Sequence, residues 1–145
     1  MDDRWNLLFI GFPIVWIVGL VTLSIIVRRR QGRPIFPRRP PAALFAEFLA
    51  SGGPDGMLSG ARNCLLVTVE RDKLTIVPIF PFNLMFVGDI FGLDIVVPRH
   101  AVVRVERRPE MFRERVVVHY RRPHKEDHFV LYLRDPAAFE QAMNA

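Results

Sequence analysis

One stretch of this chain restricts its fold more than any other. Residues 7–27 carry no charge over twenty-one positions and read LLFIGFPIVWIVGLVTLSIIV. A helix rises about 1.5 Å per residue, so this run extends roughly 30 Å, the thickness of the hydrocarbon core of a bilayer. Because lipid offers the backbone no hydrogen-bond partners, a lone segment that crosses it must be helical. We therefore expect residues 1–27 to form a short outside tail and a transmembrane helix.

The charges on either side of this run predict its orientation. Before it come two aspartates and one arginine, and Trp5 stands where an indole prefers the headgroup layer. The basic residues that follow the run are Arg28, Arg29, Arg30, Arg33, Arg38 and Arg39. Cytoplasmic flanks of membrane helices are enriched in arginine and lysine. The sequence thus predicts a single-pass protein of the inner cell membrane, with its N-terminus outside and its C-terminal domain in the cytoplasm.

Two other interpretations of the apolar run fit less well. A cleaved signal peptide needs a basic start, a shorter apolar stretch and a small-residue cleavage site, whereas this chain begins with acidic residues and continues into arginines. A helix buried in a protein core usually has one polar face, but the only hydroxyl side chains here are Thr22 and Ser24. We therefore prefer the membrane anchor.

The distribution of charge argues against a nucleic-acid partner. The net charge is +5, and residues 1–41 account for all of it with seven arginines and two aspartates. Residues 42–145 hold thirteen basic and thirteen acidic residues, so the remainder has no net basic field for a phosphate backbone. We expect the basic residues from Arg28 to Arg39, together with Trp5, to contact the membrane surface, including anionic headgroups. The single cysteine fits a reducing compartment, and the predominance of arginine over lysine favours a bacterial source.

The segment after the anchor reads as a linker. Residues 28–60 begin with the basic, proline-rich RRRQGRPIFPRRPP, which favours extended structure. Residues 42–50 space their apolar side chains as a short helix does, and residues 51–60 form a glycine-rich loop. We accordingly place the start of the β domain at residue 61.

From residue 61 onward the apolar pattern changes to the alternation of strands. The strands expected span residues 63–69, 74–79, 84–87, 93–97, 101–108, 115–121 and 127–133. In the last hairpin, pairing Val118 with Phe129 and His119 with His128 keeps one face continuously apolar. Asp135 followed by Pro136 predicts the start of a C-terminal helix. The core residues expected are Leu66, Leu74, Ile76, Ile95, Val103, Val105, Val116, Val118, Phe129, Leu131, Phe139 and Met143.

Three stretches together resemble the pleckstrin-homology-like (PH-like) fold, including its GRAM and bacterial PH members. They read CLLVTVERDKLTIV, LDIVVPRHAVVRVERR and HFVLYLRDPAAFEQAMNA, and the resemblance covers residues 62–145. It implies a mainly β, α+β fold: a membrane anchor, then a split β-barrel with a C-terminal helix at one end. A β-sandwich or another split barrel with a terminal helix is the structural alternative. Relatives that bind phosphoinositides carry spaced basic residues in the first hairpin, whereas this turn is mixed in sign, with Glu70, Arg71, Asp72 and Lys73.

The sequence offers no enzyme signature. It contains no GxxxxGK[ST], HExxH, CxxC or GxSxG motif, and its three serines lie in the apolar run and the glycine-rich loop. His119 and His128 could face each other across a hairpin, but surface histidines explain them as well as a metal site does. We expect no catalytic residues, cofactor, metal or small-molecule substrate, and we interpret Cys64 as a packing residue.

Two features could mediate binding. The apolar connection over residues 78–92 could enter the bilayer or contact a membrane partner through Phe80, Phe82, Phe86 and Phe91, although a buried strand is the alternative. Arginines around the last strands could meet an acidic surface, but glutamates are interspersed with them, which is typical of a solvated surface.

The function that this pattern favours is interaction at a membrane surface. We expect the cytoplasmic PH-like domain to bind lipid or another membrane protein with a weak affinity that the anchor makes effective by raising local concentration. The alternative is a small accessory or assembly subunit of a membrane complex that acts through its transmembrane helix. An enzyme or metal protein that uses the histidine face is the remaining possibility.

Overall fold

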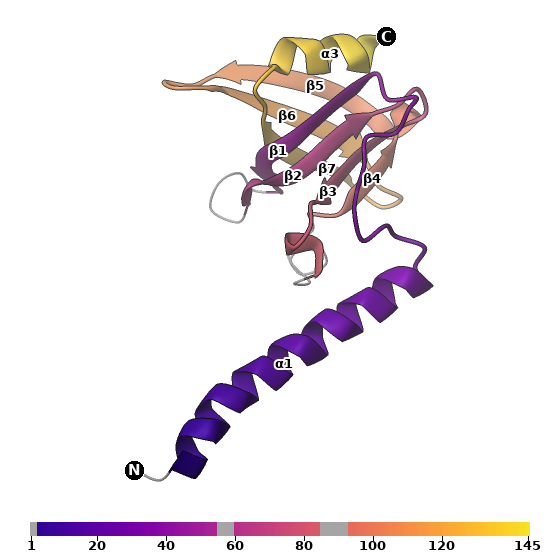
Figure 1. Cartoon of the computed structure of the whole chain (residues 1–145). Helices are drawn as coiled ribbons and strands as arrows, with labels where there is room; N and C mark the ends of the chain where they lie inside the picture. The colour runs from indigo at the N-terminus through magenta and orange to yellow at the C-terminus, as the bar shows by residue number, and fades with distance from the viewer. Residues whose placement is uncertain (1–2, 55–59, 85–92) are drawn as a thin grey trace.

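An N-terminal helix stands apart from a folded β domain in the computed structural model of this chain (Figure 1), which describes residues 3–54, 60–84 and 93–145. The helix, α1, spans Asp3–Arg30 and has nearly all of its apolar surface exposed. Its 28 residues correspond to a length of about 42 Å. It is the one helix in the described parts of the chain that is long and apolar enough to cross a membrane, as the sequence predicted.

The β domain is one antiparallel sheet of seven strands in the order β4-β3-β2-β1-β7-β6-β5, followed by helix α3. The strands are β1 (Phe45–Gly53), β2 (Ala61–Val69), β3 (Lys73–Pro78), β4 (Ile95–Pro98), β5 (Val102–Pro109), β6 (Glu114–Arg121) and β7 (Glu126–Tyr132). Two 3₁₀ turns, η1 (Phe82–Leu84) and η2 (Arg99–Ala101), precede and follow β4, and α3 spans Pro136–Asn144. The expected mainly β unit with a C-terminal helix is therefore confirmed at the level of its elements.

The last hairpin has the register that the sequence predicts. Val118 pairs with Phe129 and His119 pairs with His128. The side chains of Val118 and Phe129 are both buried, as a continuous apolar face requires. The start of α3 is also as expected, because the Asp135 side chain accepts a hydrogen bond from the Ala138 amide.

The helix expected over residues 42–50 is wrong: this segment enters strand β1. Its pairing with β2 shifts register between Glu47 and Ala50, and Leu49 has a φ of 61°. The bulge leaves both Phe48 and Leu49 exposed, so the apolar residues lose the period of two and imitate a helical spacing. Since β1 pairs with both β2 and β7, residues 45–53 of the predicted linker belong to the sheet.

The strand predicted over residues 84–87 is wrong at Leu84, the one residue of that range that the structure describes. Leu84 belongs to the 3₁₀ turn η1 rather than to a strand. The other residues of that prediction lie outside the described residues.

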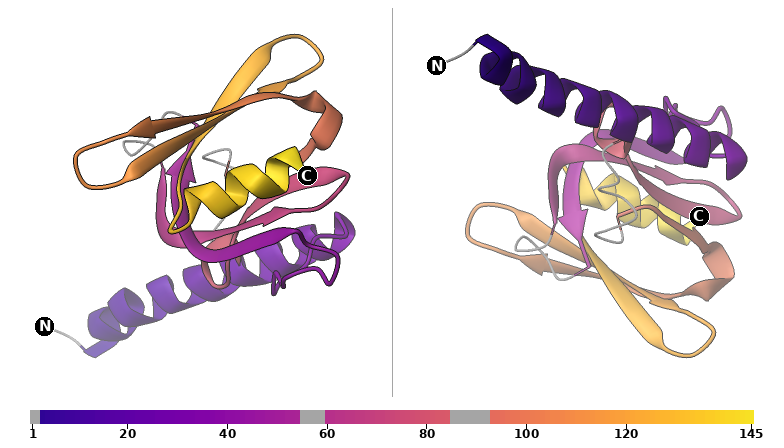
Figure 2. Two further views of the ribbon diagram at one scale, coloured as in Figure 1. Left: turned by 90° about the horizontal axis from the view of Figure 1, so that it is seen from above. Right: turned by 90° about the horizontal axis from the view of Figure 1, so that it is seen from below.

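The core lies between the curved sheet and α3, which covers it at the end opposite α1 (Figures 1 and 2). Phe139 of α3 is fully buried and meets Phe45 of β1 edge-on, with 5.5 Å between ring centroids. Val103 is the exception among the core residues expected, because a register shift between Val102 and Arg104 turns its side chain to the surface. Leu66 is buried too, but it lies on the outer face of the sheet beneath the linker rather than in the main cluster.

Candidate functional site at the junction of α1 and the β domain

The carboxyl-terminal turns of α1 are attached to the β domain by polar contacts. Ser24, within the apolar run, donates a hydrogen bond from its hydroxyl to the Leu84 carbonyl oxygen of η1. One turn later, Nε of Arg28 donates to the Asn83 carbonyl oxygen at 2.8 Å. The short η1 turn thus lies directly against the end of the helix.

A buried carboxylate completes this attachment. Oδ2 of Asp94, just before β4, lies 3.4 Å from Nη2 of Arg28 and 3.0 Å from Nη1 of Arg33. The side chains of Arg28 and Asp94 are only 8% and 7% exposed, whereas that of Arg33 is 38% exposed. A charge removed from water needs a partner of opposite sign, and here a single aspartate supplies it for two arginines.

The first part of the linker folds back onto the same place. The Asn83 side-chain amide donates to the Ile35 carbonyl oxygen at 2.6 Å, and the ring of Phe36 packs on that of Phe80 with 4.8 Å between centroids. Asn83 is itself buried. The proline-rich segment is therefore a packed connection here and does not act as a free tether.

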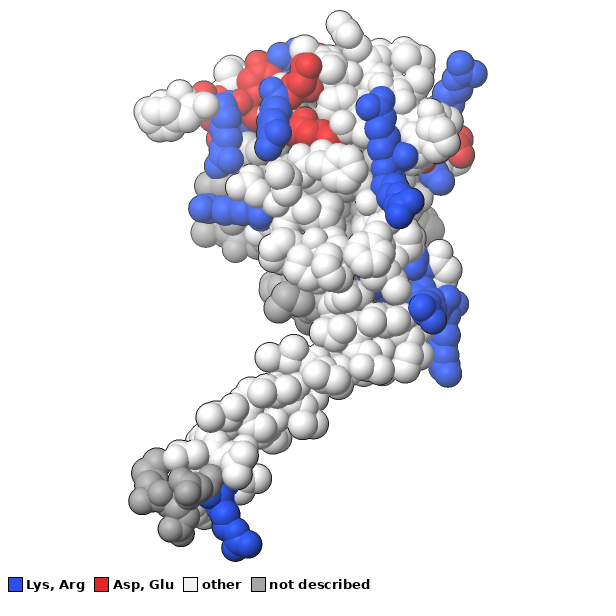
Figure 3. All heavy atoms as spheres, in the orientation of Figure 1, with Lys and Arg blue, Asp and Glu red and all other residues white. Residues whose placement is uncertain are grey.

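The basic residues predicted to contact the membrane separate into two groups. Arg28 departs from that prediction, because its guanidinium is buried against Asn83 and Asp94 and faces the domain. Arg33 is shared, since it pairs with Asp94 but remains partly exposed. The residues that are exposed are Trp5, Arg29, Arg30, Arg38 and Arg39. Figure 3 shows basic side chains gathered where α1 meets the domain, while the middle of the helix is uncharged.

The phenylalanines of the apolar connection are only partly within the described residues. Phe80 and Phe82 are both exposed, so the alternative of a buried strand does not hold for these two. They lie beside or within η1, the element that contacts α1. Phe86 and Phe91 lie outside the described residues.

A groove that the sequence did not indicate runs between the linker and the outer face of β2, β3 and β4. Its volume is about 590 Å³, and Leu66, Val77 and Val96 line its apolar side. The charged residues that border it are Arg28, Arg33, Arg38, Lys73, Glu70 and Asp94. Cations outnumber anions along this border, which is continuous with the junction.

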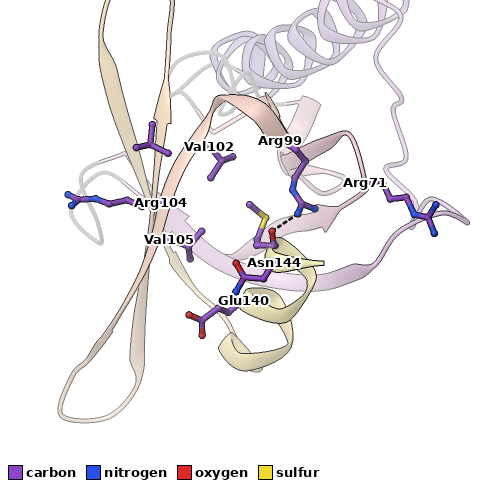
Figure 4. A pocket seen from close by; sticks show the side chains of 9 residues that line it. Arg71, Arg99, Val102, Arg104, Val105, Glu140 and Asn144 are labelled. Atoms are coloured by element: carbon purple, nitrogen blue, oxygen red, sulfur yellow. Dashed lines mark hydrogen bonds between the residues drawn. The ribbon is translucent and has the colours of Figure 1, made fainter.

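A second hollow, of about 350 Å³, lies between η2, β5 and α3 (Figure 4). Its central cation is Arg99, whose Nη1 donates to the carbonyl oxygens of Glu70 and Ala142 at 3.0 and 3.1 Å and whose Nη2 donates to that of Met143. A cation at the carboxyl end of a helix satisfies its last carbonyl groups and its dipole. Arg99 therefore holds α3 in place, which gives this hollow a structural explanation.

The histidine pair is present, but it lies among carboxylates and not in a ligand set. The rings of His119 and His128 are 6.0 Å apart, and Nε2 of His119 lies 3.5 Å from a carboxylate oxygen of Glu106. Arg108 donates a hydrogen bond to Glu106, and this bond lowers the pKa of the Glu106 carboxyl. In the described parts of the chain, no three His, Cys, Asp or Glu side chains are grouped closely enough to hold a metal ion.

Arginines near the last strands are paired with acidic side chains. Arg107 donates to both carboxylate oxygens of Glu114, from Nε to Oε2 at 2.9 Å and from Nη2 to Oε1 at 3.0 Å, and from Nη1 to Glu140 at 3.1 Å. These contacts raise the pKa of the Arg107 guanidinium, with the hydrogen bond to Glu114 as the main cause. The arrangement matches the solvated mixed surface described as the alternative to a basic patch. Cys64 is buried, and burial raises the pKa of its thiol, which disfavours a nucleophilic role.

Comparison with protein-family models, with curated proteins and with solved structures finds no significant match.

Sequence reasoning missed Ser24, Asn83 and Asp94, the residues that form the junction together with Arg28. A weak signal existed, because Ser24 is one of only two hydroxyl residues in the apolar run and stands one turn before Arg28. The partners lie 55 to 66 residues further along the chain, so no local pattern identifies them.

Proposed function

We propose that this chain is a single-pass protein of the inner cell membrane whose cytoplasmic β domain binds the lipid surface or a neighbouring membrane protein. The observation that carries the proposal is the junction: Ser24 and Arg28 at the end of the apolar helix are hydrogen-bonded to η1, and Arg28 is also paired with Asp94. A helix that crosses the bilayer would place these contacts at the headgroup layer. The domain would then keep one face toward the membrane.

The surface beside the junction has the composition that such a role needs. Phe80 and Phe82 are exposed next to the helix, and Arg29 and Arg30 are exposed at its end. Apolar side chains that enter the boundary of the acyl region and cations that meet anionic headgroups are the two contributions to binding at an interface. The positive-inside rule supports the cytoplasmic orientation.

We further propose that the β domain is PH-like. The element order supports this, because seven antiparallel strands precede a C-terminal helix that closes one end of the sheet. A role in interaction, without catalysis, is part of the proposal, and the pairing of the arginines near the last strands with glutamates supports it.

One observation favours the alternative of an accessory or assembly subunit that acts through its membrane helix. A shallow apolar hollow of about 320 Å³ lies on the amino-terminal half of α1, lined by Trp5, Leu8, Phe9, Phe12 and Pro13. Bulky side chains around a proline offer a shaped surface to another membrane helix. In this case the partner would contact α1 and not the domain.

Membrane insertion and topology can be tested directly. We expect the protein to stay in the membrane pellet after carbonate washing, and its C-terminal domain to resist protease added outside intact cells. Release by carbonate, or digestion from outside, would overturn the proposal.

Site-specific photo-cross-linking separates the two candidate functions. A photoreactive residue at Phe82 samples the junction, one at Phe9 samples the hollow on α1, and one at His124 in the β6–β7 turn is the control. We expect lipid or protein adducts at Phe82 above those at His124. Protein adducts at Phe9 alone would favour the assembly subunit.

A further inference from the structure

The turn between β5 and β6 presents two large apolar side chains to solvent. Met111 is 89% exposed and Phe112 is 93% exposed, the highest values among the large apolar residues in the described parts of the chain. Single exposed apolar residues are common on protein surfaces. Two adjacent ones at the tip of a projecting hairpin have no contact with the core that would explain them.

The two strands that lead to this tip, β5 and β6, are paired up to the turn itself. Pro109 pairs with Glu114 at the end of the ladder, and the Glu110 amide donates to the Arg113 carbonyl oxygen at 2.9 Å to close the turn. The Arg113 guanidinium stacks over the ring of Tyr132 of β7, 4.1 Å from its centroid. The tip is therefore presented in a defined position, which reduces the entropy lost when it binds.

The direction of the β5–β6 hairpin relative to α1 indicates what its tip would contact. In Figures 1 and 2 its tip extends from the domain toward the side on which the amino-terminal half of α1 lies, while α3 lies on the opposite side of the domain from α1. The contacts of Arg28 with Asp94 and Asn83 hold the domain in this orientation. A bilayer crossed by α1 would thus face the tip.

The charge of the β5–β6 hairpin is also compatible with the surface of a bilayer that contains anionic lipid. Residues 104–115 contain five arginines and three glutamates; the glutamates pair with four of the arginines, so the stem keeps a small net positive charge next to the apolar tip. Segments that bind in the interface of a membrane combine apolar side chains with basic ones in this way. An acidic stem would instead be repelled by anionic lipid.

We propose that Met111 and Phe112 insert into the headgroup layer of the bilayer that α1 crosses, as a second membrane contact of the domain. The occupant of this surface is the lipid itself, with a preference for anionic headgroups. The inference rests on the proposed function, because it requires α1 to span that bilayer. Together with Phe80 and Phe82 near the junction, the tip would hold the sheet at a fixed tilt over the membrane.

A fluorescent reporter of polarity tests this proposal. In a Cys64→Ala background, Phe112→Cys is labelled with the nitrobenzoxadiazole dye, and the full-length protein is reconstituted in vesicles of phosphatidylcholine and phosphatidylglycerol. The matched control is His124→Cys, in the exposed turn between β6 and β7. We expect a blue-shifted emission at residue 112 and quenching by nitroxide-labelled lipids several-fold stronger than at residue 124. Vesicles of phosphatidylcholine alone should reduce this difference.

Failure of this inference is distinguishable from failure of the proposed function. Both tryptophans, Trp5 and Trp16, belong to α1, so their quenching by the same nitroxide lipids reports insertion of the helix independently of the dye. Quenched tryptophans with equal, water-like emission at residues 112 and 124 would overturn the inference and leave the anchor intact. Unquenched tryptophans would overturn both. Met111→Cys repeats the measurement at the neighbouring position and must agree.

Discussion

Replacing Asp94 with alanine should detach the domain from α1 without unfolding the sheet. The carboxylate of Asp94 is the partner of Arg28, and both side chains are less than one-tenth exposed. Removing one member of a buried ion pair costs about 3–5 kcal/mol, because the other charge is left without compensation. We expect the lower end, about 3 kcal/mol, since Arg28 stands at the end of a helix and can turn toward water. The contribution of Arg33 is smaller because its side chain is 38% exposed.

This cost falls on the docking of the helix against η1, since Asp94 precedes β4 and joins no two strands. A loss of about 3 kcal/mol corresponds to about a 150-fold increase in the undocked population. Hydrogen exchange of the protein in lipid nanodiscs measures it at the Asn83 and Leu84 amides of η1, which donate to the carbonyl oxygens of Ile79 and Pro81. We expect their exchange to accelerate by up to that factor. Arg29→Ala, one residue from Arg28 and exposed, is the matched control and should leave the exchange unchanged.

A double-mutant cycle decides whether the ion pair is the cause. Arg28→Ala and Asp94→Ala should each release the domain, and the double variant should be little worse than either alone. A coupling energy below about 0.5 kcal/mol would refute the reasoning, as would an effect of Arg29→Ala equal to that of Asp94→Ala.

Three further predictions concern the β domain. Gly52→Ala should destabilise the sheet by about 1–3 kcal/mol in chemical unfolding, because the new Cβ would lie 2.3 Å from the Val130 carbonyl oxygen, whereas Gly19→Ala meets nothing within 4 Å and should be neutral. Phe139→Ala should cost about 3–5 kcal/mol by the same measurement, since the ring is fully buried, and a change below 1 kcal/mol, on the order of a surface substitution, would contradict its place in the core. Cys64 should react with maleimide at neutral pH only on unfolding, because burial raises the pKa of its thiol, and rapid labelling of the native protein would show the opposite.

The elements that could be predicted are those whose determinants are close in the sequence. The register of β6 and β7 follows from alternation on either side of one short turn, so a slip would have exposed Val118. The start of α3 follows from Asp135 and Pro136 alone. Strand β1 could not be recognised in this way, because its bulge at Leu49 removes the alternation and its partners lie in β2 and in β7, near the end of the chain.

The candidate site could be predicted only in part, because some of its contacts join residues that are far apart in the sequence. The exposure of Phe80 and Phe82 matches the binding interpretation of the apolar connection. The assignment of Arg28 to the lipid surface was wrong, because the sequence shows its charge but not the Asp94 carboxylate that lies 66 residues later and draws it inward.

The sequence by itself determined that this chain begins with a helix long and apolar enough to cross a membrane and continues into a β unit closed by a helix. The length of the apolar run, its lack of charge, and the alternation of apolar and polar residues in the strands are local properties of the sequence. They limit which hydrogen bonds the backbone can make. Only the tertiary structure decided how the two parts are joined. The buried ion pair of Arg28 with Asp94 and a few hydrogen bonds fix the orientation of the β domain relative to α1. These interactions are strong because folding removes water from groups that are far apart in the sequence.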